Sequence, residues 1–309
     1  MCCLFGLIDT CGYFNKRQKN TILSVLSAEC EVRGTDATGI AYNTNGALKI
    51  FKRALPASRM WYSTPHDVNV IMGHTRMTTQ GTESKNYNNH PFYGTAGSAA
   101  FALAHNGVLH NDAVIRKDKK LPETKIQTDS YIAVQLLEKE ESLTFDSLAK
   151  MAETVRGSFA FTVLDNTDNL YFVKGDNPLC IYHFVNRGFY LYASTKTIAD
   201  KAILRLGLDK MKHEDIPIRC GDILRVDKAG KISTAHFDTS GIYSCYNGYF
   251  APYSYSFFEM ERQPDAEHIQ IIRDMAGAFG YAPEIVDGLL EDGFTPDEIE
   301  GFFYDGEIV

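Results

Sequence analysis

The stretch that decides the fold is MCCLFGLID, residues 1–9. Its apolar run after two cysteines predicts a buried first strand, with Cys2 and Cys3 on opposite faces. If Met1 is removed, Cys2 becomes the first residue and carries both a thiol nucleophile and a free α-amino group. The ordinary alternative is a hydrophobic strand that contains small thiols, because buried cysteines are common.

Length, charge and cysteine usage narrow the class of protein. The 309 residues predict one large domain, or one large and one small domain. A net charge of −8 with scattered lysines gives no footprint for nucleic acid or an anionic membrane. The seven cysteines form no CxxC pair, which argues against a zinc site or disulfide framework. With no visible signal peptide and no membrane-length apolar run, these features predict a cytoplasmic protein.

The hydrophobic pattern predicts an α+β fold. We expect strands over 3–9, 39–52 (a hairpin), 68–76, 99–107 and 158–175 (a second pair), and near 181–184, 189–193, 222–226 and 232–236. We expect helices over 15–34, 129–140, 144–157 and 197–206. Strands, two helices and then more strands suit stacked antiparallel sheets with helices on their outer faces.

The last 70 residues differ in character. Residues 241–264 are rich in aromatic residues and show no clear period, so we expect a connecting arm. Residues 265–309 carry three helical patterns with Pro or acidic residues at their starts, which predicts a small three-helix module. The expected domains are therefore 2–240, the arm, and this module.

Four polar stretches follow the apolar strands: RGTDATG (33–39), GHTRMTTQGTESKNYNNHPF (73–92), AHNGVLHN (104–111) and TDS (128–130). Strand ends hold polar groups rigidly while leaving them open to a substrate. Hydrolysis of an amide needs a nucleophile, a base, oxyanion donors and groups that fix the substrate. A processed Cys2 supplies the first two, since an α-amino group has a pKa of about 7.7–8.0 and is partly neutral at cellular pH.

Together with Cys2, these stretches resemble the glutaminase domain of class II glutamine amidotransferases, which are N-terminal-nucleophile hydrolases. The resemblance covers about residues 2–235, and five separated motifs occur in the family's order. It implies a four-layer αββα sandwich. It also implies hydrolysis of L-glutamine to glutamate and ammonia through a thioester on Cys2, with no cofactor and no metal.

The resemblance assigns roles to individual residues. Asn106 and Gly107 match the oxyanion-hole pair. The substrate-binding positions are Arg76 for the α-carboxylate, Asp129 for the α-ammonium group, Thr79 near the carboxylate, and His90 in the NHP loop. Arg33 and Asp36 are expected to order the loop beside the Cys2 amine.

Each assignment has a plainer alternative. Asn-Gly is a common hairpin turn, Thr-Asp is a common helix N-cap, and Arg76 suits a surface salt bridge. His74 and His105 are interpreted as core histidines with satisfied hydrogen bonds, and Cys3 as a packing residue.

Two departures from the family pattern leave the substrate open. Met77 stands where the family usually has Trp, and Gln80 where many members have His. An alternative hypothesis is therefore a stand-alone amidase that acts on another γ-glutamyl or N-acyl amide.

The sequence also bears on which enzyme would accept the ammonia. Relatives commonly carry an ammonia-consuming synthase, but the sequence shows no P-loop and no GxGxxG motif after a strand. We therefore expect a separate acceptor synthase, and the sequence leaves a homo-oligomer open. The third hypothesis is a non-catalytic regulatory or scaffold subunit.

Overall fold

The computed structural model describes residues 2–243, and beyond them 269, 272–273, 276–277, 281–291 and 299. By its internal contacts the chain divides into two compact units, Met1–Ala251 and Pro252–Val309. The first unit contains all of the candidate site residues.

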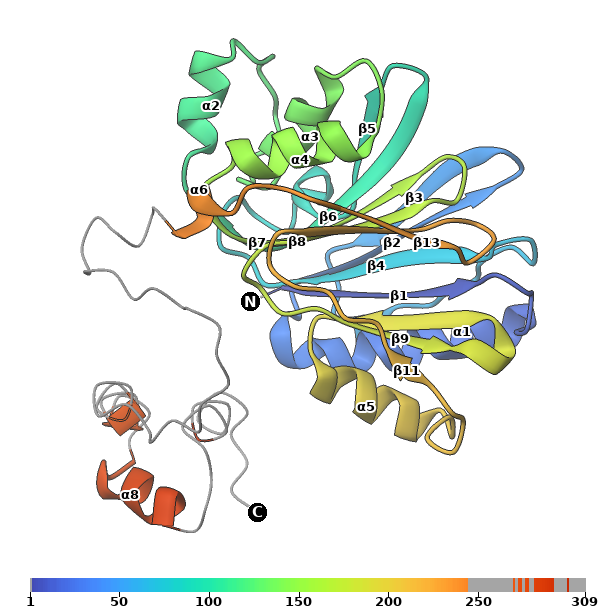
Figure 1. The fold of residues 1–309 in the computed structure, drawn as a ribbon, viewed down its shortest axis with the longest axis vertical. Helices are drawn as coiled ribbons and strands as arrows, with labels where there is room; N and C mark the ends of the chain where they lie inside the picture. The colour runs from blue at the N-terminus through green and yellow to red at the C-terminus, as the bar shows by residue number, and fades with distance from the viewer. Residues whose placement is uncertain are drawn as a thin grey trace. The chain divides into compact units, whose positions relative to one another are not determined.

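Within residues 2–243, two antiparallel sheets are stacked between helices (Figure 1). The seven-stranded sheet, sheet A, has the order β11-β9-β10-β1-β4-β2-β3, and the six-stranded sheet, sheet B, has the order β13-β12-β8-β7-β6-β5. Helices α1 and α5 cover the outer face of sheet A, and α3 and α4 cover that of sheet B. This is the predicted four-layer αββα sandwich, which the structure confirms.

The strands of sheet A are β1 (Cys3–Asp9), β2 (Ala37–Thr44), β3 (Ala47–Arg53), β4 (Val70–Arg76), β9 (Cys180–Phe184), β10 (Phe189–Ala193) and β11 (Glu214–Asp215). Those of sheet B are β5 (Phe92–Ala96), β6 (Ala99–Leu109), β7 (Gly157–Asp165), β8 (Leu170–Lys174), β12 (Asp222–Val226) and β13 (Ile232–His236). The helices of this unit are α1 (Lys16–Glu29), α2 (Asp112–Asp118), α3 (Tyr131–Glu138), α4 (Phe145–Thr154), α5 (Lys196–Arg205) and α6 (Ser240–Tyr243). Short 3₁₀ turns lie at Cys30–Arg33, Ala57–Arg59, Asn86–Asn88 and Val185–Arg187.

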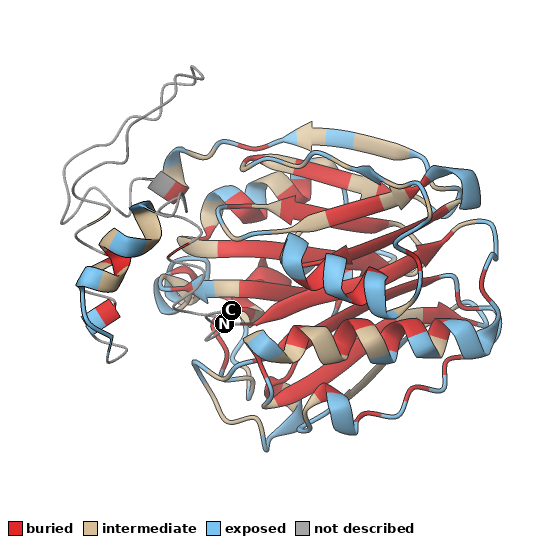
Figure 2. Cartoon of the chain, turned by 90° about the horizontal axis from the view of Figure 1, so that it is seen from below, coloured by how far each residue is buried: buried red, intermediate tan, exposed pale blue. Residues whose placement is uncertain are grey.

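Helix α1 forms because its sequence supplies both a start signal and an apolar stripe. Asn15 and Gln18 cap it reciprocally, which satisfies two of the unpaired N–H groups at the helix start. Ile22, Leu23 and Leu26 are buried against sheet A. Figure 2 shows the result, since buried residues line the strands while the helices keep exposed residues on their outer sides.

The space between the two sheets is filled by the inward faces of their strands. Leu4, Ile8 and Met72 of sheet A meet Ala102 and Ala104 of sheet B, and all five are fully buried. Small alanine side chains let the two backbones approach closely. The cluster places β1 directly opposite β6, which is the arrangement that builds the site.

Four helices and strands of this unit were not predicted: β5, α2, and the very short β11 and α6, which have two and four residues. Strand β5 is only five residues long and directly follows the polar loop, so its sequence was not distinguished from that loop. In the structure its residues alternate between buried and exposed, as in a strand with one face on the core. Helix α2 lies in a stretch with few apolar residues, of which only Ile115 is buried. Weak apolar patterns explain why β5 and α2 were missed, and β11 and α6 are too short to show a pattern.

The second unit is described only in part. Helix α8 spans Glu284–Glu291, and Val286 belongs to a small apolar cluster with Ile272, Ala276 and Ile299. Most of the expected arm, 241–264, and most of the expected three-helix module lie outside the described residues, so that domain division stays a prediction. Among the helices that are described, none is long and apolar enough to cross a membrane.

Candidate active site

The candidate site lies at one end of the space between the sheets. Cys2 precedes β1, and Arg76 ends the antiparallel neighbour β4, where Cys3 pairs with Thr75. Asn106 lies near the end of β6, two and four residues beyond the inward-facing Ala104 and Ala102. Side chains two residues apart share a face of a strand. The site residues therefore continue the inward faces of their strands, with polar groups in place of apolar ones.

The Cys2 thiol is buried and held by backbone groups. Its side chain is 9% exposed, its Sγ donates to the Met77 carbonyl at 3.5 Å, and its own carbonyl accepts Arg33 Nε at 3.1 Å. Burial raises the pKa of Cys2, while the Met77 hydrogen bond and the Arg76 charge oppose that rise. The thiol is thus protonated at neutral pH and needs a base to become a nucleophile.

Cys3 points the other way, as expected. It is fully buried among the residues between sheet A and its helices, and its Sγ lies 3.0 Å from Cys30 Sγ. Cys3 therefore packs outside the site.

Arg76 is almost completely buried, so the surface salt bridge is wrong. Its Nη1 donates to Asn89 Oδ1 at 2.7 Å and its Nη2 to the Gln80 carbonyl at 2.5 Å. Asp36 fixes the backbone that follows β4. Its N–H donates to the Arg76 carbonyl, and its carboxylate accepts Thr78 N–H. The two guanidinium bonds use two of five N–H donors, and they tie the arginine to the polar loop.

Asn106 and Gly107 lie inside strand β6, so the hairpin turn is wrong. Asn106 Nδ2 donates to Ser194 Oγ at 3.3 Å, and its Oδ1 is buried with no hydrogen-bond partner among the described residues. Gly107 has φ of +145°, a conformation that only glycine adopts readily. A side chain there would also collide with the Ser158 carbonyl.

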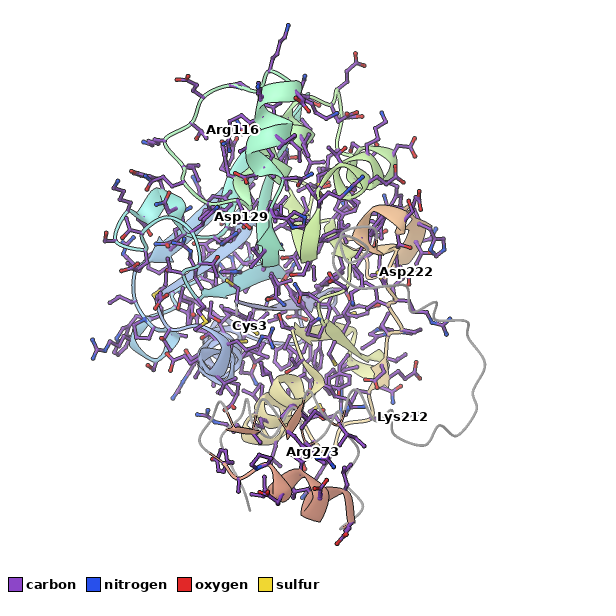
Figure 3. The ribbon with its side chains drawn as sticks, turned by 90° about the vertical axis from the view of Figure 1, so that its left-hand side faces the viewer. Cys3, Arg116, Asp129, Lys212, Asp222 and Arg273 are labelled. Atoms are coloured by element: carbon purple, nitrogen blue, oxygen red, sulfur yellow. The ribbon has the colours of Figure 1, made fainter. Side chains whose placement is uncertain are left out.

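Asp129 reaches the same strand from the loop before α3. Its Oδ2 accepts Leu109 N–H at 2.6 Å, and its Oδ1 lies 3.4 Å from Ser130 Oγ. The N-cap of α3 is Ser130, so Asp129 is not a helix cap. Figure 3 labels Asp129 and Cys3, which lie on the sheet B and sheet A sides of the site.

Three histidines form a buried cluster beside these residues. The rings of His74 and His90 are 4.2 Å apart, and His74 Nε2 lies 2.9 Å from the His105 carbonyl. Burial lowers the pKa of His74 to about 3 and lowers the pKa of His90 and His105 as well. His105 is satisfied by Ser130 and Ser158, but His74 Nδ1 and both nitrogens of His90 lack a partner within the described part of the chain.

Other predicted residues lie around this centre. Thr79 is exposed in the loop, and Arg33 Nε donates to the Cys2 carbonyl. Lys52 orders the loop by donating to the Pro91 carbonyl at 2.8 Å, and burial lowers its pKa to about 8. Within the part of the chain that the structure describes, no three His, Cys, Asp or Glu side chains are placed to hold a metal ion.

Sequence reasoning missed three polar residues that touch the site. Asn89 bonds Arg76, Ser194 bonds Asn106, and Asn177 Nδ2 donates to the Asn106 carbonyl at 2.9 Å. Only Ser194 carried a usable signal, because it follows Tyr190 and Tyr192 at the spacing of one strand face.

Several known proteins are similar to this chain in sequence. The family described as "Glutamine amidotransferase domain" matches residues 74–200. Glutamine–fructose-6-phosphate aminotransferases (isomerizing) from Staphylococcus epidermidis and Shouchella clausii are 32% and 30% identical, over 61% and 59% of this chain. The chain spans 32% and 30% of the lengths of these two relatives.

Two solved structures share the fold. The glutamine phosphoribosylpyrophosphate amidotransferase of B. subtilis has a TM-score of 0.59 at 19% identity, covering 77% of this chain and 50% of that one. A structure titled as the allosteric regulatory enzyme of purine biosynthesis has a TM-score of 0.61 at 17% identity, covering 90% and 58%.

The stacked sheets with a cysteine at the start of a central strand therefore define an N-terminal-nucleophile hydrolase fold. Within that fold, residues 74–200 match a glutamine amidotransferase domain, and the similar proteins are glutamine-dependent transferases, which supports the class II domain predicted from the sequence.

Proposed function

We propose that this domain hydrolyses L-glutamine to glutamate and ammonia through a γ-glutamyl thioester on Cys2. The observation that supports it most is the convergence of four groups at one end of the inter-sheet space. These are the Cys2 thiol, the Arg76 guanidinium, the Asn106 amide and the Asp129 carboxylate, and the charges of Arg76 and Asp129 both act on the thiol.

The chemistry starts from a protonated thiol. After removal of Met1, the free α-amine of Cys2 takes the thiol proton, and the thiolate attacks the γ-amide carbon of glutamine. Asn106 Nδ2 and Gly107 N–H hold the negative oxygen of the tetrahedral intermediate. Collapse breaks the C–N bond, and the ammonium form of the amine returns its proton to the leaving ammonia. Water then attacks the thioester by the same route, releasing glutamate and the thiol.

The α-amino-acid end of glutamine is recognised by opposite charges. Arg76 binds the α-carboxylate through N–H donors not used by Asn89 and Gln80, and Thr79 lies in the same loop. Asp129 binds the α-ammonium group. His90 packs in a tilted arrangement against the rings of His74 and Phe92 and orders the loop that carries these contacts.

The acceptor of ammonia is proposed to be a separate synthase. The curated relatives match this chain over only about a third of their own length. A co-purifying enzyme that consumes ammonia would support this arrangement. Ammonia released quantitatively to solvent by the physiological assembly would contradict it.

The test of the hydrolysis has two parts. Intact-mass measurement of active protein should show the loss of Met1, and a glutamine analogue with an electrophilic diazoketone should add one equivalent to Cys2. Prior incubation with glutamine should protect the thiol, while glutaramate, the same amide without the α-amino group, should not. Retention of Met1 in fully active protein would overturn the mechanism.

A second substrate class has one observation in its favour. Met77 is half-exposed in the loop expected to close over the substrate. Because it stands where the family usually has Trp, the apolar surface that this loop offers to a substrate differs from that of the family. Turnover of other γ-glutamyl amides that exceeds glutamine turnover in a side-by-side panel would favour this amidase.

A further inference from the structure

We propose that Ser194 and Asn177 are positioning residues that orient the two donors of the oxyanion hole, Ser194 through the Asn106 side chain and Asn177 through the Asn106–Gly107 peptide. This inference rests on the proposed function, because it assigns work to Asn106 and Gly107 as oxyanion donors.

Ser194 joins the nucleophile strand to the oxyanion strand. It directly follows β10 and is fully buried, and its Oγ accepts Leu4 N–H at 2.8 Å and Asn106 Nδ2 at 3.3 Å. Leu4 lies two residues from Cys2 in sheet A, whereas Asn106 belongs to sheet B. One hydroxyl therefore sets the distance between the thiol and the amide that must act on the same carbonyl group.

The bond to Ser194 also determines how the Asn106 amide is turned. A carboxamide has two N–H donors on one nitrogen, so fixing one of them fixes the plane of both. With one hydrogen committed to Ser194, the second is available to an oxyanion in a fixed direction. Without Ser194 the amide can rotate and present its oxygen, which would repel the developing negative charge.

Asn177 acts on the backbone donor. Its Nδ2 donates at 2.9 Å to the Asn106 carbonyl, which belongs to the same peptide group as Gly107 N–H. Because the peptide is planar and trans, holding the carbonyl in one direction holds the N–H in the opposite direction. Hydrogen bonding to the carbonyl also polarises the N–H, which strengthens it as a donor.

The backbone around Gly107 shows why this peptide needs an anchor. Gly107 has φ of +145°, and a Cβ built there would lie 2.6 Å from Asn177 Nδ2. Glycine permits many backbone conformations, so the conformation must be selected by neighbours. In an extended strand, N–H groups two residues apart leave the same edge. Leu109 N–H donates to Asp129, so Gly107 N–H is directed to the edge where the substrate ammonium is proposed to bind.

The experiment uses four variants of the full chain. Ser194→Ala removes the acceptor for the Asn106 amide, and Ser194→Thr restores a hydroxyl. Asn177→Asp keeps the size of the side chain but removes its N–H donor. Asn111→Asp is the matched control, because Asn111 Nδ2 donates to the Thr154 carbonyl at 3.1 Å away from the nucleophile while its Oδ1 accepts Arg156 N–H.

Three measurements separate positioning from a merely structural role. They are kcat and KM for glutamine, the affinity for glutamate as a ground-state ligand, and the affinity for glutamate γ-semialdehyde. The aldehyde adds reversibly to the Cys2 thiol and forms a tetrahedral adduct whose oxygen occupies the oxyanion hole. Only interactions made to that oxygen change the affinity for the aldehyde without changing the affinity for glutamate.

We expect Ser194→Ala and Asn177→Asp each to lower kcat by about tenfold to a hundredfold. This loss should not exceed the fall in kcat that follows from removing an oxyanion donor altogether. The affinity for the aldehyde should fall by the same factor as kcat. KM and the affinity for glutamate should stay within about twofold of the wild-type values. Ser194→Thr should recover most of the loss, and Asn111→Asp should leave all three quantities at wild-type values. If Ser194→Ala fails to fold, Asn177→Asp at its half-buried position carries the test alone.

Wild-type kcat in both deletion variants would overturn the inference, as would an equal loss of glutamate and aldehyde affinity. These results concern the positioning alone if the wild-type chain hydrolyses glutamine. A wild-type chain that neither hydrolyses glutamine nor binds the aldehyde would overturn the proposed function, and the inference with it.

Discussion

The space between the two sheets has an apolar region and a polar end, both built by the same strands. In the apolar region, Leu4 and Met72 of sheet A pack on Ala102 and Ala104 of sheet B. At the polar end, the next inward positions are Cys2, Arg76 and Asn106, while His74 sits between Met72 and Arg76 on β4. The change from core to site is thus a change of residue type along one strand face, with no change of fold.

The two regions differ in how they contribute to stability. Burial of apolar surface contributes about 25 cal/mol per Å², whereas a buried polar group without a partner costs about 1–3 kcal/mol. Asn106 Oδ1, His74 Nδ1 and the nitrogens of His90 are buried without partners among the described residues. We therefore expect the polar end to lower the free energy of unfolding and the apolar region to raise it. A bound substrate that supplies hydrogen bonds to the polar end should restore part of the loss.

The largest effect should come from removing the nucleophile while sparing its neighbour. Cys2→Ala should lower glutaminase activity by about 10⁴-fold or more, as for other covalent nucleophiles. Cys3→Ala, on the opposite face of the same strand, should lower the melting temperature and leave kcat near wild type. Steady-state kinetics and thermal unfolding of both variants check this. Unchanged function after Cys2→Ala would support a non-catalytic subunit instead.

Arg76→Lys should have the next largest effect. A lysine keeps the charge but loses the planar donors that hold Asn89 and the Gln80 carbonyl and that are proposed to bind the substrate carboxylate. We expect kcat/KM for glutamine to fall by about a hundredfold, mostly through KM, because hydrogen bonds to charged groups are each worth about 1.5–3 kcal/mol. Glutamine titration of initial rates measures it. An unchanged KM would show that Arg76 only orders the loop.

Overpacking the apolar region should affect stability rather than chemistry. Ala104→Leu adds three carbons where the sheets meet, which should cost about 1–3 kcal/mol of unfolding free energy. Chemical denaturation measures the loss, and kcat well below the melting temperature should stay near wild type. A large fall in kcat at full stability would mean that sheet spacing at the core controls the site, and would erase the distinction between the two regions.

The parts of the fold that could be predicted are those with strong local patterns. The apolar run after Cys3 and the stripe of Ile22 and Leu26 gave β1 and α1, because each pattern is read within one element. Asn106, Arg76 and Asp129 were found through the family's motif order. The convergence of these residues agrees with that prediction, but their chemical roles stay predictions.

The rest depends on contacts between distant parts of the chain. Ser194 lies 190 residues from Leu4 and 88 from Asn106, and Asn177 lies 71 from Asn106. Ser194 shares a strand face with Tyr190 and Tyr192, which predicts that it points inward but not what it bonds, and nothing local distinguishes Asn177 from other loop asparagines. The histidines show the same limit, since His74 was expected to be satisfied but its Nδ1 has no described partner.

The last effect is the pH dependence of stability at the polar end, which appears only when the pH falls below the ordinary histidine pKa. The folded pKa values of His74, His90 and His105 are lowered by burial, His74 to about 3, from an ordinary value of 6.5. Below pH 6.5 the unfolded chain binds protons that the folded chain does not, so stability is full above that pH and falls as the pH drops toward the folded values. Each neutral histidine should contribute a slope of about 1.4 kcal/mol per pH unit in that window.

His90→Leu sharpens this prediction because it removes one imidazole whose nitrogens both lack described partners. Unfolding by urea between pH 4 and pH 8 should give a shallower acid slope for this variant, together with higher stability at pH 5 relative to pH 8. His110→Gln, at an exposed position, is the control and should follow the wild type. If His90→Leu retains the full wild-type slope, His90 is protonated in the folded chain, and the polar end is stabilised by charge rather than strained by burial.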